Sequence, residues 1–429
     1  MIKKLSFLVV LFWASLSFGQ TNNTSPYSYF GIGDSNKIST VASSSMGGIN
    51  TALNYSSELN FANPAALNAL QFTTFSFAAR LKYLQVDDGD VTQDASYTSL
   101  SSLAIGFPVG EKGGLMVGLQ QNTNVGYVID EELYNTEEEV IEINTFKGNG
   151  GTNRFFGSFG YLVAEGLSIG IEGEYLFGNL ENSIDNIRQD VNLNTRHDQN
   201  SIITGSSLKF GSQYTKKLKE ELELKLGASV KLENKLKAKS EEYLYTYLPG
   251  GSGGFPNDTL VSNTNVVGEI TRPVAFTAGT GIGKPNKWHV GIEFESQSAM
   301  TFDENVFQNN NKVQYSSFSR YSAGGYWIPK KNSITSYWKR VIYRAGIKFE
   351  ETGLAVKVSE NSQNFTPIDD FGISFGLGLP IGNQLSLVNL GLEYGKRGST
   401  SEGLIKENYF NLRLSLNLAE KWFRKRKIN

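Results

Sequence analysis

Long segments of this chain alternate apolar and polar residues with a period of two, and no other feature constrains the fold as strongly. From Leu222 to Leu232 every second residue is apolar, whereas the residues between them are Glu, Lys, Gly or Ser. The same alternation returns in 167–177, 288–295 and 410–418. A helix repeats every 3.6 residues and would scatter these positions around its axis. The segments therefore predict β-strands with one apolar and one polar face.

The number and length of these segments favour a membrane barrel. About fourteen of them are found, beginning near 72, 100, 115, 152, 167, 201, 222, 267, 288, 317, 340, 371, 385 and 407. Each is about as long as a tilted membrane-spanning strand. We therefore predict an all-β fold, a transmembrane antiparallel β-barrel of about 14 strands over residues 72–423. A soluble all-β sandwich also alternates, but it does not account for so many long strands.

The predicted connections fall into two length classes. Short turns are expected at 111–114, 164–166, 216–221, 285–287 and 381–384, and long loops at 130–151, 179–200, 235–266, 299–316, 351–370 and 396–406. Outer-membrane barrels have short periplasmic turns and long external loops. This topology places four tryptophans at the periplasmic interface, where indole rings prefer to lie. They are Trp288, Trp327, Trp338 and Trp422.

The two ends of the chain indicate export. Residues 1–19 read as a signal peptide, with Lys3 and Lys4 before a short apolar run. The chain has no Cys and a net charge of −2, so it offers no lipoprotein cysteine, no disulfide and no basic face for nucleic acid. We expect the outer membrane of a Gram-negative bacterium, with both termini periplasmic and residues 424–429 as a basic periplasmic tail.

Residues 20–71 are the sizeable part of the mature chain that does not alternate. A barrel of this size encloses more space than side chains fill, so we expect this segment to be a plug inside the lumen. Asn63 and Pro64 suit a helix start, as N-cap and first helical residue, although an ordinary capped turn reads the same way. Gly47 and Gly48 permit close backbone approach or positive φ.

The order of these parts resembles a known family. A signal, a plug closed by Phe61-Ala62-Asn63-Pro64-Ala65-Ala66-Leu67, and about fourteen strands ending near Tyr409-Phe410 and Trp422-Phe423 resemble the long-chain fatty-acid outer-membrane transporters of FadL type, in a Bacteroidetes-like member. The resemblance implies a hatch that rearranges, or a lateral wall opening, for hydrophobic compounds. Carried over, it implies these hatch residues: Tyr27, Tyr29, Phe30, Gly47, Gly48, Asn63 and Pro64.

Two further groups of residues are candidates for contact with a ligand. Lumen-facing Lys209, Arg344, Lys348 and Arg413 could hold a carboxylate headgroup, or pair with lumen carboxylates such as Glu172, Glu293 and Glu393 and fix the plug. Beside a glycine-rich turn, a candidate external capture loop contains Tyr243, Tyr245, Tyr247, Leu248 and Phe255. Its alternative is a strand extended above the membrane.

Enzymatic chemistry has little support in the sequence. Gly166-Leu167-Ser168-Ile169-Gly170 matches the nucleophile pattern of serine hydrolases, but it opens a strand rather than a strand-to-helix turn. His197 and His289 are the two histidines of the chain, and without Cys they offer no metal cluster. We expect neither a catalytic residue nor a metal or cofactor.

Three function classes follow. The first is a hatch-gated channel for uptake of hydrophobic, fatty-acid-like small molecules. The second is a non-transporting structural or carrier subunit of a larger outer-membrane protein assembly or secretion complex, and the third is a membrane lipase. The expected partners are outer-membrane lipids, a hydrophobic small-molecule ligand and other outer-membrane proteins, and nucleic acid is not among them. An apolar cavity reaching a breach in the wall would favour the channel, and a lumen packed solid would favour the subunit.

Overall fold

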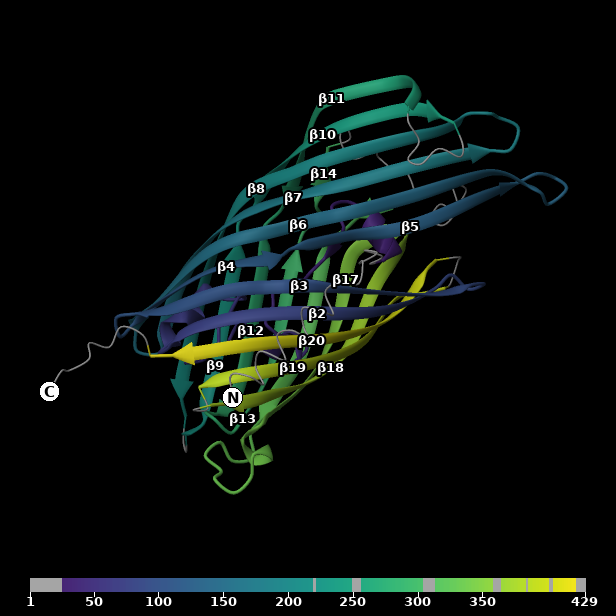
Figure 1. Cartoon of the computed structure of the whole chain (residues 1–429). Coiled ribbons are helices and arrows are strands. Elements are labelled where there is room, and N and C mark those ends of the chain that lie inside the picture. The colour runs from purple at the N-terminus through teal and green to yellow at the C-terminus, as the bar shows by residue number, and fades with distance from the viewer. Residues whose placement is uncertain are drawn as a thin grey trace, which may run out of the picture.

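The alternating segments form an antiparallel sheet that closes on itself (Figure 1). The computed structural model describes residues 25–218, 221–248, 256–303, 313–357, 364–382, 385–400 and 404–421. The predicted signal peptide and basic tail lie outside these residues. The first wall strand pairs with both the second and the last, because Thr74 lies opposite Gly106 on one side and Ala419 on the other. The sheet therefore has no end, and the predicted barrel is confirmed.

The elements are short in the first 70 residues and long in the wall. The segment before the wall contains η1 (Pro26–Tyr29), β1 (Asp34–Ser35), α2 (Val41–Ser44) and η2 (Pro64–Ala69). The strands that follow are β2 (Thr73–Asp87), β3 (Thr92–Val109), β4 (Gly113–Gln121), β5 (Thr123–Tyr134), β6 (Val140–Ala164), β7 (Leu167–Arg188), β8 (Asn194–Lys217), β9 (Glu223–Lys231), β10 (Asn234–Tyr247), β11 (Pro256–Arg272), β12 (Ala275–Lys284), β13 (Trp288–Gln297), β14 (Thr301–Phe302), β15 (Val313–Tyr315), β16 (Phe318–Trp327), β17 (Ile342–Val356), β18 (Thr366–Ile381), β19 (Ser386–Gly398) and β20 (Lys406–Glu420), with η4 (Trp338–Arg340) before β17.

Several wall strands are made of two pieces. β4 and β5 both pair with β6, β9 and β10 both pair with β8, and β11 and β12 pair with β10 and β9 in turn. β13 with β14, and β15 with β16, are likewise successive pieces of one strand. With these pairs joined, the wall has fourteen strands, as in FadL-type outer-membrane barrels.

The apolar faces point outward. Leu226, Ile292 and Leu414 are 42%, 60% and 38% exposed, whereas the alternate residues Ser229 and Glu293 are buried. A soluble sandwich would turn these leucines and isoleucines into a shared core. The observed faces instead leave an apolar band around the barrel for lipid and a polar lining within.

Aromatic residues gather where the short turns lie. Trp288 on β13 is directly opposite Trp327 on β16, and the Trp327 ring lies 5.8 Å from that of Tyr343. Trp338 follows in η4, while Trp422 lies outside the described residues. The described tryptophans thus meet at one rim of the barrel, which is the arrangement that an interfacial belt requires.

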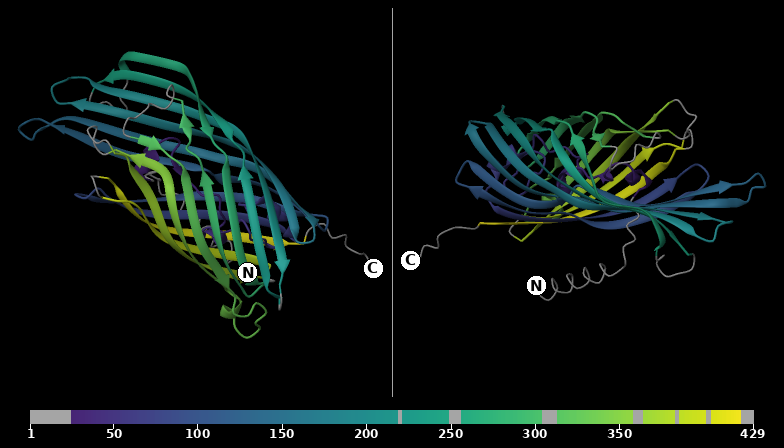
Figure 2. Two further views of the ribbon diagram at one scale, coloured as in Figure 1. Left: turned by 180° about the vertical axis from the view of Figure 1, so that it is seen from behind. Right: turned by 90° about the horizontal axis from the view of Figure 1, so that it is seen from above.

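Three of the predicted long loops are largely strand. β5 and β6 extend through 130–134 and 140–151, and β7 and β8 fill most of 179–200. β10 and β11 likewise continue into 235–266. The prediction was wrong there because backbone hydrogen bonds continue the ladders of β5 with β6 and of β7 with β8, and this pairing does not require the side chains to alternate. The hairpins lengthen one side of the barrel, as Figure 2 shows.

Residues 25–70 occupy the inside of the barrel. Leu59, Phe61, Leu67 and Leu70 are buried in one cluster with Met116 and Phe156 of the wall. Met46, Ile49 and Leu53 form a second cluster, and each is 3% exposed or less. In Figure 1 this segment is the purple chain seen between the strands. We call residues 25–70 the plug segment.

Candidate functional site

The plug segment touches the wall by direct backbone contact. Gly346 of β17 faces Met46, and a Cβ at Gly346 would lie 2.1 Å from the Met46 carbonyl carbon. Gly47 has φ +69° and Gly48 has φ +95°, so both predicted glycines adopt the left-handed region. Ser374 Oγ on β18 accepts a 2.8 Å hydrogen bond from the Gly47 N–H. Wall and plug segment are therefore packed without side chains between them at this point.

Asn63 combines a helix cap with an anchor. Its Oδ1 accepts from the Ala65 N–H at 3.0 Å, and Pro64 takes the first position of η2. Its Nδ2 donates to the carbonyl oxygens of Thr51 and Ser212, each at 2.9 Å. The side chain is fully buried. The capped turn that the sequence allowed is thus present, and the same residue also bonds the wall.

The aromatic residues at the start of the plug segment have separate partners. Tyr27 donates its hydroxyl to the Ile405 carbonyl, and its ring lies 4.8 Å from the Arg397 guanidinium. The Tyr29 ring packs edge-on against that of Tyr127 at 5.2 Å. Phe30 packs against a different cluster that holds Tyr27, Ile368 and Leu404. All three predicted hatch aromatics therefore lie at the junction of plug segment and wall.

β1 of the plug segment pairs with the wall where a wall strand is interrupted. Asp34 lies opposite Asn124 and Ser35 opposite Thr123, at the beginning of β5. The Asn36 N–H continues the ladder to the Asn122 carbonyl, which lies in the break between β4 and β5. Beyond this point, β3 pairs with β2 and β5 pairs with β6, and the described residues show no pairing between β3 and β5. The wall is therefore split along residues 92–101 and 125–134.

Asp34 is held by two wall cations. Its carboxylate accepts a 2.7 Å hydrogen bond from Arg397 and lies 3.5 Å from Lys82 Nζ. Burial alone would raise the pKa of the Asp34 carboxyl, but Arg397 and Lys82 outweigh burial and hold this pKa well below its usual value. Asp34 therefore stays ionised and ties the start of the plug segment to β19 and β2.

Wall carboxylates also bind the plug segment. Glu293 Oε2 accepts from the backbone N–H groups of Asn50 and Thr51, each at 2.7 Å. Lys37 of the plug segment lies 3.6 Å from the same carboxylate. Two backbone donors that have no helix partner are thus satisfied by one lumen carboxylate.

The four predicted lumen cations all have carboxylate partners. Lys209 lies 2.8 Å from Glu172 and also donates to the Phe61 carbonyl. Arg344 pairs with Glu58 of the plug segment at 3.4 Å. Lys348 and Arg413 share Glu393. All four cations thus pair with carboxylates, as in the second of the two arrangements that the sequence left open, and Lys209 and Arg344 also contact the plug segment.

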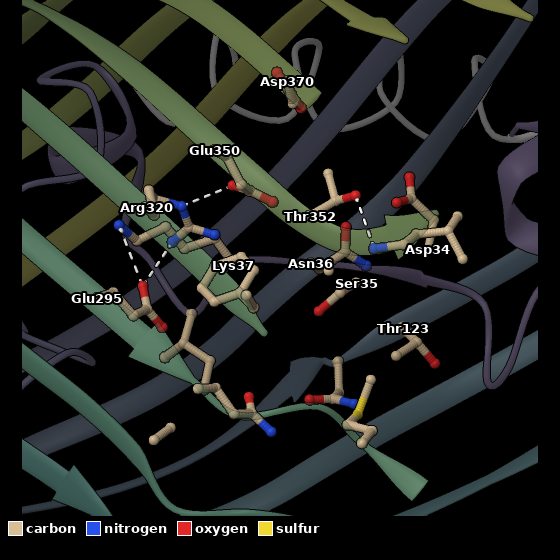
Figure 3. A pocket seen from close by; sticks show the side chains of 18 of the residues that line it. Asp34, Ser35, Asn36, Lys37, Thr123, Glu295, Arg320, Glu350, Thr352 and Asp370 are labelled. Atoms are coloured by element: carbon tan, nitrogen blue, oxygen red, sulfur yellow. Dashed lines mark hydrogen bonds and ion pairs between the residues drawn. The ribbon is translucent and has the colours of Figure 1, made fainter. Parts of the chain in front are cut away.

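A cavity of about 340 Å³ remains between the plug segment and the wall. Figure 3 shows its charged lining, with Arg320 between Glu295 and Glu350 and with Asp34, Asn36 and Lys37 entering from the plug segment. Ligand pockets for apolar molecules are lined mostly by apolar side chains. Here apolar side chains such as Ile32, Met300 and Phe302 share the lining with many ionisable ones: Asp34, Lys37, Arg80, Lys82, Lys209, Lys231, Arg272, Glu293, Glu295, Arg320, Lys348, Glu350, Asp370, Glu393, Arg397 and Arg413.

The candidate capture residues lie on a strand. Tyr243, Tyr245 and Tyr247 belong to β10, where Tyr245 donates to Asp198 and Tyr247 to Asp185. Leu248 is 60% exposed, and Phe255 lies outside the described residues. The tyrosines are therefore held by neighbouring strands, which was the alternative to a loop.

The hydrolase pattern is not arranged as a triad. Ser168 is buried in β7, opposite Gln213 of β8. His197 lies opposite Ile184 on the same strand pair, sixteen positions further along β7 and therefore roughly 50 Å from Ser168. His289 stacks on Tyr326 instead. The described residues contain no group of three or more His, Cys, Asp or Glu able to hold a metal ion, and no helix among them is long and apolar enough to span a membrane.

The sequence interpretation missed Asp34 and Arg397. Each contacts a partner far away in the chain, so no local pattern marks it. One signal was present, since glycines recur on the lumen face of the wall, as at Gly227, Gly324 and Gly346, and each meets plug backbone. Glycine inside a strand often marks the close approach of another backbone.

Several solved structures are similar to this chain in fold. The toluene transporter TbuX of Ralstonia pickettii is 12% identical, with 94% of this chain and 100% of that chain covered and a TM-score of 0.57. A Pseudomonas aeruginosa FadL homologue is 11% identical, with 90% and 98% covered and a TM-score of 0.58. The Pseudomonas putida toluene transporter TodX is 13% identical, with 90% and 98% covered and a TM-score of 0.56. Because these sequence identities are low, the similarity shows a shared fold and nothing about function.

No curated protein matches the chain. A family model does, and it covers all of residues 1–429 under the description BamG. This chain, with the fold of a FadL-type outer-membrane barrel, therefore belongs to the BamG family.

Proposed function

We propose that this protein is a non-transporting barrel that serves as a structural or carrier subunit of a larger outer-membrane protein assembly. One observation carries the proposal, namely the way in which the plug segment is fixed. Its backbone contacts wall glycines, and buried charges bind it on several sides, as Glu293, Arg344 and Arg397 show. Charged side chains make up much of the lining of the space that remains, and an apolar solute entering it would meet ions that must stay hydrated or paired.

The proposed orientation follows the turns. The end with the short turns and the aromatic rim would face the periplasm, together with both termini. The extended hairpins β5–β6, β7–β8 and β10–β11 would stand outside the membrane. Their length gives the assembly a large external surface, and Tyr243, Tyr245, Tyr247 and Leu248 would belong to it rather than to a capture loop.

A disulfide lock tests the proposal, because the chain has no cysteine of its own. Ser35→Cys with Thr123→Cys joins directly opposed residues of β1 and β5, a separation that suits a disulfide. If the barrel is structural, the oxidised double variant supports the assembly as well as the wild type does. The single Ser35→Cys variant controls for the substitution.

Purification in mild detergent supplies the second arm of the test. The proposal requires other outer-membrane proteins to co-purify in near-stoichiometric amounts. A protein that purifies alone, and that shows uptake abolished by the lock and restored by reduction, would contradict it.

A second candidate function is hatch-gated uptake of hydrophobic, fatty-acid-like molecules. The split between β3 and β5 favours it, because the apolar cluster of Tyr29, Val125 and Tyr127 lies beside this part of the wall. The solved relatives of the fold include toluene transporters. In this case Tyr27, Tyr29, Phe30, Gly47, Gly48, Asn63 and Pro64 would move as the hatch, and the lock would abolish uptake.

A further inference from the structure

Two neighbouring wall strands are interrupted at the same level. The first break separates β9 from β10 at residues 232–233, and the second separates β11 from β12 at residues 273–274. Pro273 contributes to the second break, since it has no N–H for the ladder. Asn234 and Arg272, which flank the two breaks, are directly opposite each other. Lys231 and Ala275 are opposed on the other side of the breaks.

Buried polar atoms without partners gather at these breaks. Asn234 is 9% exposed, and neither its Oδ1 nor its Nδ2 has a hydrogen-bond partner among the described residues. The register of β8 and β10 pairs Thr204 with Lys237, and its continuation brings Ser207 opposite Asn234. Ser207 Oγ and Arg272 Nη1 are likewise buried and without a partner within the described chain. Such groups rarely remain unsatisfied in a native protein.

The charges at the breaks are not balanced by the protein. Arg154 pairs with Glu172 at 2.9 Å and Glu174 at 3.0 Å. Lys209 shares Glu172, and Lys231 shares Glu174. Arg272 forms no ion pair among the described residues: Glu174 attracts its guanidinium from a longer distance, and Arg154 and Lys231 repel it. Three cations therefore share two carboxylates, and Arg272 adds a fourth positive charge without a close partner among the described residues.

We propose that Arg272, Lys231, Asn234 and Ser207 bind an oxyanion, of the phosphate or carboxylate class, that enters from the lumen cavity. Arg272 and Lys231 both line this cavity, whose volume exceeds that of a phosphate group. A guanidinium offers two parallel donors to such an anion, and the Asn amide and Ser hydroxyl add two more. The site does not depend on the proposed function. A free anion and the headgroup of an anionic lipid both supply this chemistry.

Titration with inorganic phosphate tests the site in the full-length protein in detergent. Thermal unfolding is followed at constant ionic strength, with chloride replaced by phosphate. The wild type should gain stability until the site saturates. Arg272→Gln should weaken phosphate binding about tenfold or more, because it removes a charged donor pair. Lys235→Gln is the matched control, since Lys235 is exposed nearby and pairs with Glu269 outside the site.

Native mass spectrometry separates the two sources of the anion. If the wild type retains an anionic phospholipid and Arg272→Gln does not, the headgroup of that lipid is the bound oxyanion. If phosphate stabilises the protein saturably and no lipid is retained, the site binds a free anion. If Arg272→Gln fails to fold, Arg272→Lys replaces it as the test variant. It keeps the positive charge but loses the paired guanidinium donors, so its phosphate binding should again be weaker than that of the wild type. An equal phosphate response in wild type and variants, or no response together with no retained anion, would overturn the proposal and leave water as the occupant.

Discussion

Asp34 and Arg397 are 363 positions apart in the chain, yet the Asp34 carboxylate accepts a 2.7 Å hydrogen bond from the Arg397 guanidinium. The first belongs to the plug segment and the second to β19. Arg397 also stacks over Tyr27, so one wall side chain contacts two points of the plug segment. Asp34 belongs to β1, and β1 covers the base of the split between β3 and β5. The contact with Arg397 therefore also holds the strand that closes this end of the split.

Arg397→Gln is expected to loosen the start of the plug segment. The substitution leaves the Asp34 carboxylate with Lys82 alone, and loss of one partner of a buried ion pair costs about 3 kcal/mol. Limited proteolysis should then cut within residues 25–40 before the barrel unfolds. The exposed pair Lys235–Glu269 provides the control, because Lys235→Gln should change the cleavage rate little. Unchanged protection of residues 25–40 in Arg397→Gln would contradict the assigned role.

The same ion pair predicts a dependence on pH. The pKa of Asp34 is lowered in the folded protein, so the folded state binds this proton less tightly than the unfolded chain. Its stabilisation is complete above the unfolded pKa of about 3.9 and is lost as the pH falls from there through the folded value. The melting temperature of the wild type should therefore approach that of Asp34→Asn on acidification below about pH 4. A constant difference between the two proteins down to pH 2 would exclude Asp34 as the titrating group.

Gly346→Ala should displace the plug segment while the wall remains intact. The added Cβ would lie 2.1 Å from backbone of Met46, and backbone cannot rotate away as a side chain can. Overpacking of this kind costs about 1–3 kcal/mol. Gly157→Ala is the control, since a Cβ there meets nothing within 4 Å. Thermal unfolding compares the two, and equal melting temperatures would show that the contact at Met46 is not tight.

Asn63→Ala should destabilise the protein by about 3 kcal/mol, because several buried partners lose their hydrogen bonds together. They include the Thr51 and Ser212 carbonyls and the Ala65 N–H. Asn68→Ala tests the same helix η2 at a side chain for which no hydrogen bond is found within the described residues. Chemical denaturation measures both variants. A loss for Asn68→Ala as large as that for Asn63→Ala would assign the effect to the helix rather than to the anchor.

The period-two alternation determined the barrel, because the lipid outside and the polar lumen inside act on each strand residue by residue. Leu226, Ile292 and Leu414 therefore face outward as the sequence predicted. The pairing of Lys209 with Glu172 was also within reach, since both are lumen-facing residues and neighbouring strands bring such residues together. The sequence could not show that β5 and β6 continue as strands through 130–134 and 140–151, because their backbone pairing there does not depend on an apolar face.

Tertiary structure alone decided how the plug segment is held and where the wall is interrupted. Asp34 meets Arg397, and Glu293 meets Asn50, across hundreds of residues, so that no periodicity records the pairing. Arg272 looks like any other lumen cation in the sequence. It differs from Lys209, Arg344 and Arg413 because it forms no ion pair among the described residues, where the nearby Glu174 is already paired with Arg154 and Lys231, and that is a property of the closed barrel.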